Sequence, residues 1–405
     1  MKLQAALDAI VQNYALFTAD QLARLDSGKA KLLRLAAKIG YFQGSSAYYR
    51  IAVVCPLEEK VTEQQLLEAG LIWANKVSNG EKTVLYLVGK RFTPVINYLI
   101  HFFGPRIEVR LAYFTPKLRT TFMVAGKDVK SLAPRYSLPV PRTQDYWEKV
   151  FNPVEKGWFL AALEYFKGFC RQGIEVCFLD NWVSVKFQGL EIVRLSKKES
   201  RLKISLTTRY PREVSGLPKE EKEGWINAQG LLNSEFTAAF EARLSALRED
   251  RGLFSRLCPE KQFLEHLLCA QLIANESISN AYCQLDVGVK GETSLTIDIL
   301  GKNSWGNLLV IAVSPNRDIS GFVRCLEQLV WAKVYQSEIK RIYFADAYLS
   351  DPEGWVVSCQ KRAHPDLEML WSLLVPTVNV KLAMVNEDWL WEGIKDIKWL
   401  TNVSR

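Results

Sequence analysis

The side chain best suited to take part in chemistry is an aspartate in a run of residues with a strand pattern. Asp298 lies in the run Ser294–Leu300, and the apolar run Leu308–Ser314 follows after a turn at Gly301–Asn307. Asp298 alternates with apolar neighbours, so the pattern predicts that its side chain faces away from them. There it could serve as an oxygen ligand for a hard divalent cation such as Mg²⁺. The alternative interpretation is an ordinary strand aspartate that faces solvent.

Two further polar residues fall on predicted helices beside this strand pair. Glu265 lies in the pattern Pro259–Ala274, and Gln328 lies in the pattern Phe322–Val334. A carboxylate and an amide near Asp298 could support a metal ion. Equally, Glu265 could be an exposed helix carboxylate and Gln328 a solvated polar residue.

These residues belong to a set of motifs over about residues 256–395. The motifs are Pro259-Glu260-Lys261-Gln262-Phe263-Leu264-Glu265, Ile297-Asp298-Ile299-Leu300, Gly306-Asn307-Leu308-Leu309-Val310-Ile311 and Leu326-Glu327-Gln328-Leu329-Val330-Trp331. Together they resemble the PD-(D/E)xK, restriction-endonuclease-like, nuclease superfamily. The resemblance implies that Asp298 is the first catalytic aspartate, Glu265 the helix glutamate that supports the metal, and Gln328 the glutamine of the next helix. It fails at Ala312 and Ser314, which stand where the second carboxylate and the lysine are expected.

This departure leads to three hypotheses of function. The first is a catalytically inactive relative, without a cofactor, that binds nucleic acid, with DNA as the first expectation, or serves in a nucleic-acid-processing assembly. The second is an active endonuclease that uses Mg²⁺ or Mn²⁺ held by Asp298, Glu265 and Glu292, with Lys290 or Lys302 in place of the lost lysine. The third is a protein-interaction scaffold, since twelve tryptophans could supply anchors for protein partners.

The N-terminal region repeats short stretches of the C-terminal region in the same order. Four pairs correspond: Ile51–Pro56 with Val310–Pro315, Leu71–Val77 with Leu329–Val334, Tyr86–Val88 with Tyr343–Ala345, and Glu108–Ala112 with Asn379–Ala383. The shared Trp-Ala pair and strand-ending proline favour an internal duplication. The N-terminal copy has no acidic residue between Ser27 and Leu57, so it is predicted to lack hydrolytic chemistry.

The N-terminal third carries the excess positive charge. Residues 1–150 hold 21 of the 52 Lys and Arg and 12 of the 44 Asp and Glu, a balance of +9, whereas the remainder has a balance of −1. A basic unit of this kind can attract a polyanion, or it can simply be a solvated basic surface. The predicted nucleic-acid contacts are Lys29, Lys31, Arg34, Lys38, Lys90, Arg91, Lys117, Arg119, Lys127 and Lys130. Tyr41, Phe42, Tyr48 and Tyr49 lie among them, either to stack on bases or to fill a core.

Alternation of helical and strand patterns predicts an α/β fold with two restriction-endonuclease-like units flanking an α+β middle segment. The predicted divisions are 1–118 for the basic unit, 119–143 for a proline-rich basic linker, 144–250 for the middle segment and 251–405 for the nuclease-like unit. Helices are expected at Met1–Arg24, Gly28–Ile39, Thr62–Lys76, Phe92–Phe103, Lys156–Gln172 and Gly230–Arg248. Strands are expected at Tyr49–Cys55, Thr83–Val88 and Ile107–Phe114, and an antiparallel meander at residues 174–206.

Other chemistry finds little support in the sequence. The eight cysteines form no C-x-x-C pair and only three histidines are present, so neither a zinc site nor disulfides are expected. No phosphate-binding glycine loop and no G-x-S-x-G elbow occur. The apolar runs are too short to span a bilayer and the first residues lack a signal-peptide core, which predicts a cytoplasmic protein without a membrane partner.

Overall fold

The chain forms a mixed α/β structure, as predicted, with three sheets in the part that is described. The computed structural model describes residues 23–24, 39–45, 48–56, 61–89, 92–114, 120–121, 136–137, 142–179, 181–198, 201–207, 223–226, 231–258, 260–275, 277–289, 295–315, 319–348, 350–359 and 363–400. The predicted helices Met1–Arg24 and Gly28–Ile39 lie outside these residues, apart from Ala23–Arg24 and Ile39, which are in strands.

The N-terminal sheet has the order β1-β2-β3-β4-β5-β6. Its strands are β1 Ala23–Arg24, β2 Ile39–Ser45, β3 Arg50–Pro56, β4 Thr83–Gly89, β5 Ile107–Phe114 and β6 Thr120–Thr121. The central strands β3, β4 and β5 run parallel, and β2 joins β3 antiparallel. The helices are α3 Glu63–Ser78, α4 Pro94–Leu99 and the 3₁₀ turn η2 Ile100–Phe102. Thr62, the first residue of the helix expected at Thr62–Lys76, caps α3 through a capping box with Gln65.

The middle segment is an antiparallel meander covered by helices, as predicted. Strands β8 Ile174–Phe178, β9 Trp182–Phe187, β10 Leu190–Lys198, β11 Arg201–Leu206 and β12 Glu223–Gly224 pair in that order. The helices are α5 Gln144–Val150, α6 Pro153–Lys167, the 3₁₀ turn η4 Cys170–Gln172, α7 Ser234–Glu249 and α8 Arg251–Leu257. Helix α8 was not predicted.

The C-terminal sheet has the order β18-β17-β16-β15-β14-β13-β7. Its strands are β7 Tyr136–Ser137, β13 Ile278–Val289, β14 Leu295–Asn303, β15 Leu308–Ser314, β16 Glu353–Cys359, β17 Val380–Val385 and β18 Ile397–Trp399. The helices are α9 Glu260–Ala274, α10 Ser320–Val334, α11 Gln336–Tyr343, α12 Leu367–Ser372 and α13 Trp389–Glu392. Strand β7 comes from the segment predicted as a linker and pairs with β13. None of the helices in the described ranges has the length and apolarity needed to cross a membrane.

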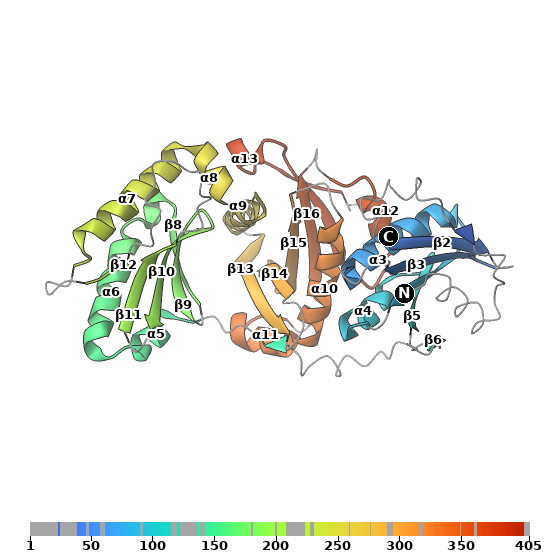
Figure 1. Cartoon of the computed structure of the whole chain (residues 1–405), viewed down its shortest axis with the longest axis horizontal. Helices are drawn as coiled ribbons and strands as arrows, with labels where there is room; N and C mark the ends of the chain where they lie inside the picture. The colour runs from blue at the N-terminus through green and yellow to red at the C-terminus, as the bar shows by residue number, and fades with distance from the viewer. Residues whose placement is uncertain are drawn as a thin grey trace.

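The three sheets lie in a row, with the C-terminal sheet at the centre of the molecule (Figure 1). Helix α9 lies on the side of this sheet that faces the middle segment, and α10 on the side that faces the N-terminal unit (Figure 1). The segment in the middle of the sequence therefore lies at one end of the molecule. The proposed divisions of the chain remain predictions, and the spatial order is a finding of the tertiary structure.

The N- and C-terminal units share a topology in their central strands. Strands β2, β3, β4 and β5 repeat the antiparallel, parallel, parallel order of β14, β15, β16 and β17. Three of the four sequence correspondences fall on equivalent elements. The match of Tyr86–Val88 with Tyr343–Ala345 is wrong, because Tyr343 ends helix α11 and the topological equivalent of β4 is β16. The stretch between α10 and β16 is longer than the stretch between α3 and β4, and it contains helix α11.

The two units pack directly against each other through α3, α4 and α10. Gln64 of α3 donates a hydrogen bond to the carboxylate of Glu327 in α10. The backbones also meet where Val375 N donates to Phe102 O over 2.8 Å. One apolar core therefore continues from the N-terminal unit into the C-terminal unit.

Candidate site in the C-terminal sheet

Asp298 lies where strands β14 and β15 stop pairing. The last paired residues are Ile299 and Ile311, and Asp298 and Ala312 follow them on the two neighbouring strands. Beyond that point the Asp298 Oδ2 atom accepts a hydrogen bond from Val313 N over 2.9 Å. Asp298 and Ala312 are therefore on adjacent strands, as the strand pairing predicted from the sequence requires. The alternative of a solvent-facing aspartate is wrong, because Asp298 is fully buried.

Two cations from helices on opposite faces of the sheet reach the Asp298 carboxylate. Lys261 of α9 places its Nζ atom 2.7 Å from Oδ1, and Arg324 of α10 places its Nε atom 3.2 Å from Oδ2. Arg324 Nη2 also donates to Val313 O over 2.7 Å. The side chains of Lys261 and Arg324 keep 35% and 21% of their surface exposed, so both connect the buried aspartate to solvent. We call Asp298, Lys261, Arg324, Glu265 and Gln328 the Asp298 cluster.

Glu265 joins the cluster from α9 and is itself buried. Its Oε2 atom accepts a hydrogen bond from Gln284 Nε2 over 3.0 Å, and its Oε1 atom is 3.5 Å from Lys261 Nζ. Burial, followed by the negative charge of Asp298, raises the pKa of Glu265 to about 7. Near neutral pH this carboxyl group is therefore partly protonated. The alternative of an exposed helix carboxylate is wrong.

Gln328 of α10 completes the cluster and is fully buried, which overturns the alternative of a solvated residue. Its Nε2 atom donates to Thr296 O over 3.1 Å and lies 3.4 Å from Asp298 Oδ1. Both partners are acceptors, which fixes the orientation of the amide. Among the described residues, no donor meets its Oε1 atom.

Asp298, Glu265 and Gln328, which the resemblance singled out, lie together in the structure. The resemblance assigned no role to Lys261 or Arg324. A signal for Lys261 was present, because it precedes Glu265 by one helical turn. No local signal marked Arg324, which lies 26 residues beyond Asp298 and approaches it only in the folded chain. Lys302 does not take the expected role, because it pairs with Asp346 near the other end of β14. Glu292 and Lys290 lie outside the described residues.

The cluster does not fit a divalent metal. Its two carboxylates are already met by an ammonium group, a guanidinium group and a backbone N–H. Ala312 and Ser314 are buried on β15 and contribute no carboxylate. In the described ranges no three His, Cys, Asp or Glu side chains are grouped so that they could hold an ion. Mg²⁺ and Mn²⁺ favour oxygen ligands, and here two cations already occupy the surroundings of Asp298.

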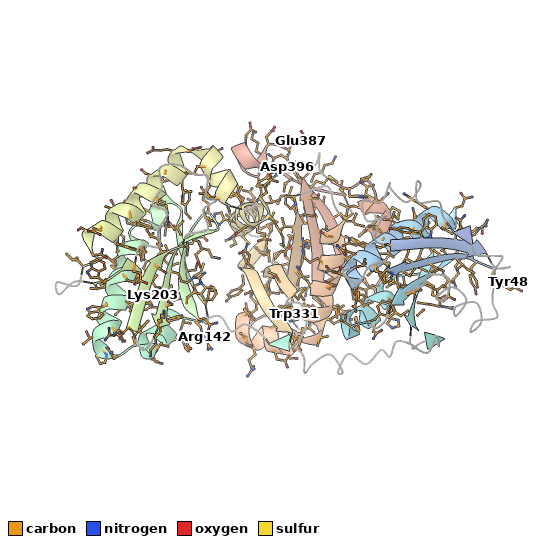
Figure 2. All side chains as sticks on the ribbon, viewed as in Figure 1. Tyr48, Arg142, Lys203, Trp331, Glu387 and Asp396 are labelled. Atoms are coloured by element: carbon orange, nitrogen blue, oxygen red, sulfur yellow. The ribbon has the colours of Figure 1, made fainter. Side chains whose placement is uncertain are left out.

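The predicted nucleic-acid contacts cannot be placed in the fold. Lys29, Lys31, Arg34, Lys38, Lys90, Arg91, Lys117, Arg119, Lys127 and Lys130 all lie outside the described residues. Of the aromatic residues among them, Tyr41 is buried and Tyr48 is exposed. Tyr41 is buried against Trp73, with ring centroids 5.8 Å apart, so it is a core residue. Tyr48 is 89% exposed at the far end of the N-terminal unit (Figure 2).

The comparisons with known proteins include a distant structural likeness. No family model and no curated protein matches the chain. Among solved structures, the crystal structure of protein VC1899 from Vibrio cholerae matches 82% of this chain and 79% of its own, with 11% sequence identity and a TM-score of 0.20. A likeness of that size establishes neither a shared fold nor a shared function.

Proposed function

We propose that this chain is a catalytically inactive relative of the PD-(D/E)xK nucleases that binds nucleic acid, with DNA as the first expectation, or serves in a nucleic-acid-processing assembly. One observation carries the proposal of inactivity. Lys261 and Arg324 neutralise Asp298 at the point where the neighbouring strand carries Ala312 and Ser314.

The electrostatics of the cluster support this proposal. A metal ion at Asp298 would have to approach a lysine and an arginine that already contact both carboxylate oxygens. Its repulsion from these cations would be strong in a site of low dielectric constant. The two cations offset the charges of Asp298 and Glu265, which is the role that a divalent ion has in a working nuclease. The site retains the acidic residue of the family without its ion-binding partners.

The proposed nucleic-acid role is supported by charge and by the repeated topology. The excess of positive charge lies in residues 1–150. The N-terminal unit repeats the central strand order of the C-terminal unit, which supports the proposed internal duplication. The two units also share one apolar core, so they are held together in one body. Two similar units in one chain could grip a duplex as a nuclease dimer would.

The test uses the full-length protein with labelled single- and double-stranded DNA and RNA. Binding is measured at two salt concentrations, and cleavage is measured with Mn²⁺, with Mg²⁺ and with a chelator. We expect binding that weakens steeply as salt increases, because counterions are released from the phosphates. The strands should remain intact under every metal condition.

Each contrary result identifies another hypothesis. Binding that is absent or independent of salt contradicts the nucleic-acid role, and protein partners that survive nuclease treatment would then favour a scaffold. Metal-dependent cleavage that disappears in Asp298→Asn, but persists in the matched surface control Asp396→Asn, would favour an active endonuclease. Asp396 is exposed on the same C-terminal unit (Figure 2), and it lies outside the Asp298 cluster.

A further inference from the structure

Two cysteine thiols from different elements of the C-terminal unit lie side by side. Cys269 belongs to α9 and Cys283 to β13, 14 positions further along the chain, and their Sγ atoms are 2.8 Å apart. A disulfide bond needs a separation of about 2.0 Å, so a small rotation of the two side chains would close it. Cys283 is half-buried, whereas Cys269 is buried. An accessible thiol beside a second thiol that can resolve it is the arrangement that redox-sensing cysteines use.

The surroundings of the pair decide which thiol reacts first. The hydrogen bond with Cys283, followed by burial, holds the pKa of Cys269 well above its ordinary 9.0, and the charges of Glu265 and Glu175 raise it further. Cys269 therefore stays protonated near neutral pH. Because the nucleophile is a thiolate that the oxidant can reach, an incoming oxidant reacts with Cys283 first.

The thiol pair lies next to the Asp298 cluster. Cys269 and Glu265 are four residues apart, about one helical turn, so they share a face of α9. On the facing strand, Gln284 comes directly after Cys283 and donates to Glu265 Oε2 over 3.0 Å. A bond between the two cysteines would therefore join α9 to β13 one turn from this buried polar contact.

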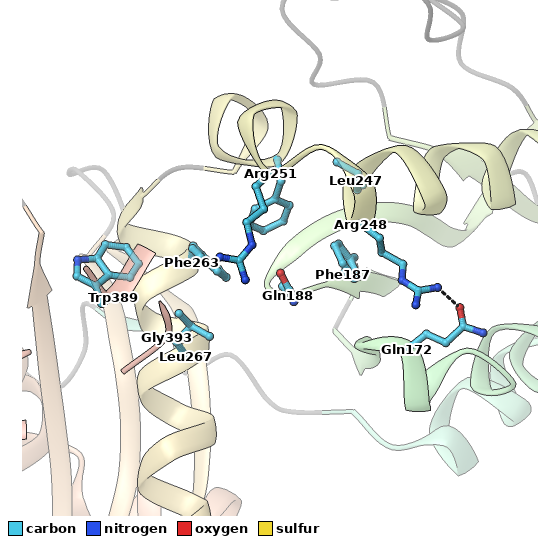
Figure 3. Close-up of a pocket in the computed structure, with 11 residues that line it drawn as sticks. Gln172, Phe187, Gln188, Leu247, Arg248, Arg251, Phe263, Leu267, Trp389 and Gly393 are labelled. Atoms are coloured by element: carbon cyan, nitrogen blue, oxygen red, sulfur yellow. Dashed lines mark hydrogen bonds between the residues drawn. The ribbon is translucent and has the colours of Figure 1, made fainter. Parts of the chain in front are cut away.

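Helix α9 is also where the C-terminal unit meets the middle segment. Gln262 Nε2 donates to Gly189 O over 2.6 Å, and His266 Nδ1 lies 3.2 Å from Glu175 Oε1. A cavity of about 290 Å³ lies at the same boundary, between Leu267 of α9 and the middle segment (Figure 3). Protein interiors are otherwise close-packed, so this cavity leaves α9 room to shift. The position of α9 therefore affects how the middle segment is attached to the C-terminal sheet.

We propose that Cys269 and Cys283 form a reversible disulfide, which holds α9 on β13 when a small-molecule disulfide such as oxidised glutathione is in excess. In a compartment that keeps thiols reduced, the bond would be transient, as redox-sensing disulfides are. The sequence alone predicted no disulfide, because it does not show that these two thiols meet. This inference does not rest on the nucleic-acid role proposed above.

The bond forms in two exchange steps. The Cys283 thiolate attacks one sulfur of oxidised glutathione, so a mixed disulfide forms and one glutathione thiolate leaves. Cys269 then gives up its proton and attacks the Cys283 sulfur, which releases the second glutathione. In total the two cysteine thiols lose two electrons and two protons, and the oxidant gains them as it becomes two thiols.

The test incubates the reduced full-length protein with oxidised glutathione, followed by intact mass spectrometry and peptide mapping. We expect a loss of two hydrogens, a link between the peptides that contain Cys269 and Cys283, and full reversal by dithiothreitol. In Cys269→Ala the second step is blocked, so one glutathione should remain on Cys283. Cys177→Ala, the matched control, removes a half-buried thiol on β8 of the middle segment and should leave the bond formed as in the parent.

Hydrogen exchange measures whether the bond holds α9 in place. Amide protons of α9 should exchange about tenfold more slowly in the oxidised protein than in the reduced protein, because the link opposes separation of α9 from β13. Helix α6 lies on the far side of the middle segment (Figure 1) and should exchange equally in both forms.

Three results would overturn the disulfide: glutathione adducts in the parent without a link between Cys269 and Cys283, a link from Cys283 to Cys177 in its place, or no retained glutathione in Cys269→Ala. Equal exchange of α9 in the two forms would overturn its role in holding the helix. The link and the exchange rates are both measured on the parent, so a variant that fails to fold does not protect the proposal from refutation.

Discussion

Replacing Asp298 with asparagine should destabilise the protein, and the structure explains why this nearly isosteric change is costly. Oδ1 meets two donors, Lys261 Nζ and Gln328 Nε2, and Oδ2 meets Val313 N and Arg324 Nε. An asparagine has one acceptor oxygen and one NH₂ group. Whichever way the amide turns, its NH₂ group faces donors, and both cations lose their buried counter-charge.

The size of the effect follows from burial. Removing one partner of a fully buried ion pair costs about 3–5 kcal/mol, because a charge remains without compensation. Here the cations keep 35% and 21% of their side-chain surface in contact with solvent, so water can screen part of the loss. We expect a decrease of about 2–4 kcal/mol in the free energy of unfolding.

Urea unfolding at about pH 7.5 in the presence of a chelator, followed by circular dichroism, measures this change. Glu265→Gln provides the matched control, because it removes a repelling carboxylate from the same cluster and should not decrease stability. A metal site behaves in the opposite way, since a carboxylate placed for an absent ion is a source of repulsion. If Asp298→Asn unfolds at the parent midpoint or above it in the chelator, the proposed role of Lys261 and Arg324 is refuted.

Three further predictions concern pH, packing and thiol chemistry. The pKa of Glu265 in the folded protein is about 7, above its ordinary 4.5. The free energy of unfolding should therefore fall by about 3 kcal/mol as pH rises from 4.5 to 7, because the folded state binds the proton more tightly. Urea titrations of Glu265→Gln should lack this fall. Gly354→Ala should cost about 1–3 kcal/mol in urea unfolding, because an added Cβ would lie 2.8 Å from α10 side chains, whereas Gly157→Ala, with open space in helix α6, should stabilise. The Sγ atoms of Cys269 and Cys283 are 2.8 Å apart, so diamide should take two hydrogens from them to form a disulfide, which intact mass detects as a loss of two hydrogens. A full thiol count after treatment, or an unchanged reaction in Cys283→Ser, would contradict this prediction.

Local patterns were sufficient to predict much of the scaffold. Apolar runs and their turn predicted β14 and β15, and Thr62 predicted the start of α3. The meander of the middle segment followed from closely spaced strand patterns. These features depend on residues close together in the sequence, so their signals are visible there.

Other elements had no clear local signal. Strand β2, Ile39–Ser45, contains two glycines and was not predicted. Its Tyr41 was expected either to stack on bases or to fill a core, and the contact with Trp73 decides for the core. Strand β13, Ile278–Val289, mixes polar and apolar residues and was not predicted. Strand formation at both places depends on a neighbouring strand, because pairing and burial favour conformations that propensity alone does not.

The order of residues was enough to place Asp298 on a strand beside Ala312. It also placed Ala312 and Ser314 where the resemblance to the nucleases would require a carboxylate and a lysine. Only the tertiary structure shows which side chains contact Asp298. Lys261 and Arg324 are 37 and 26 residues away along the chain, on helices that cover opposite faces of the sheet. A charge pair is selected by distance in space and by the dielectric constant of its surroundings, and neither is encoded in the local order of residues.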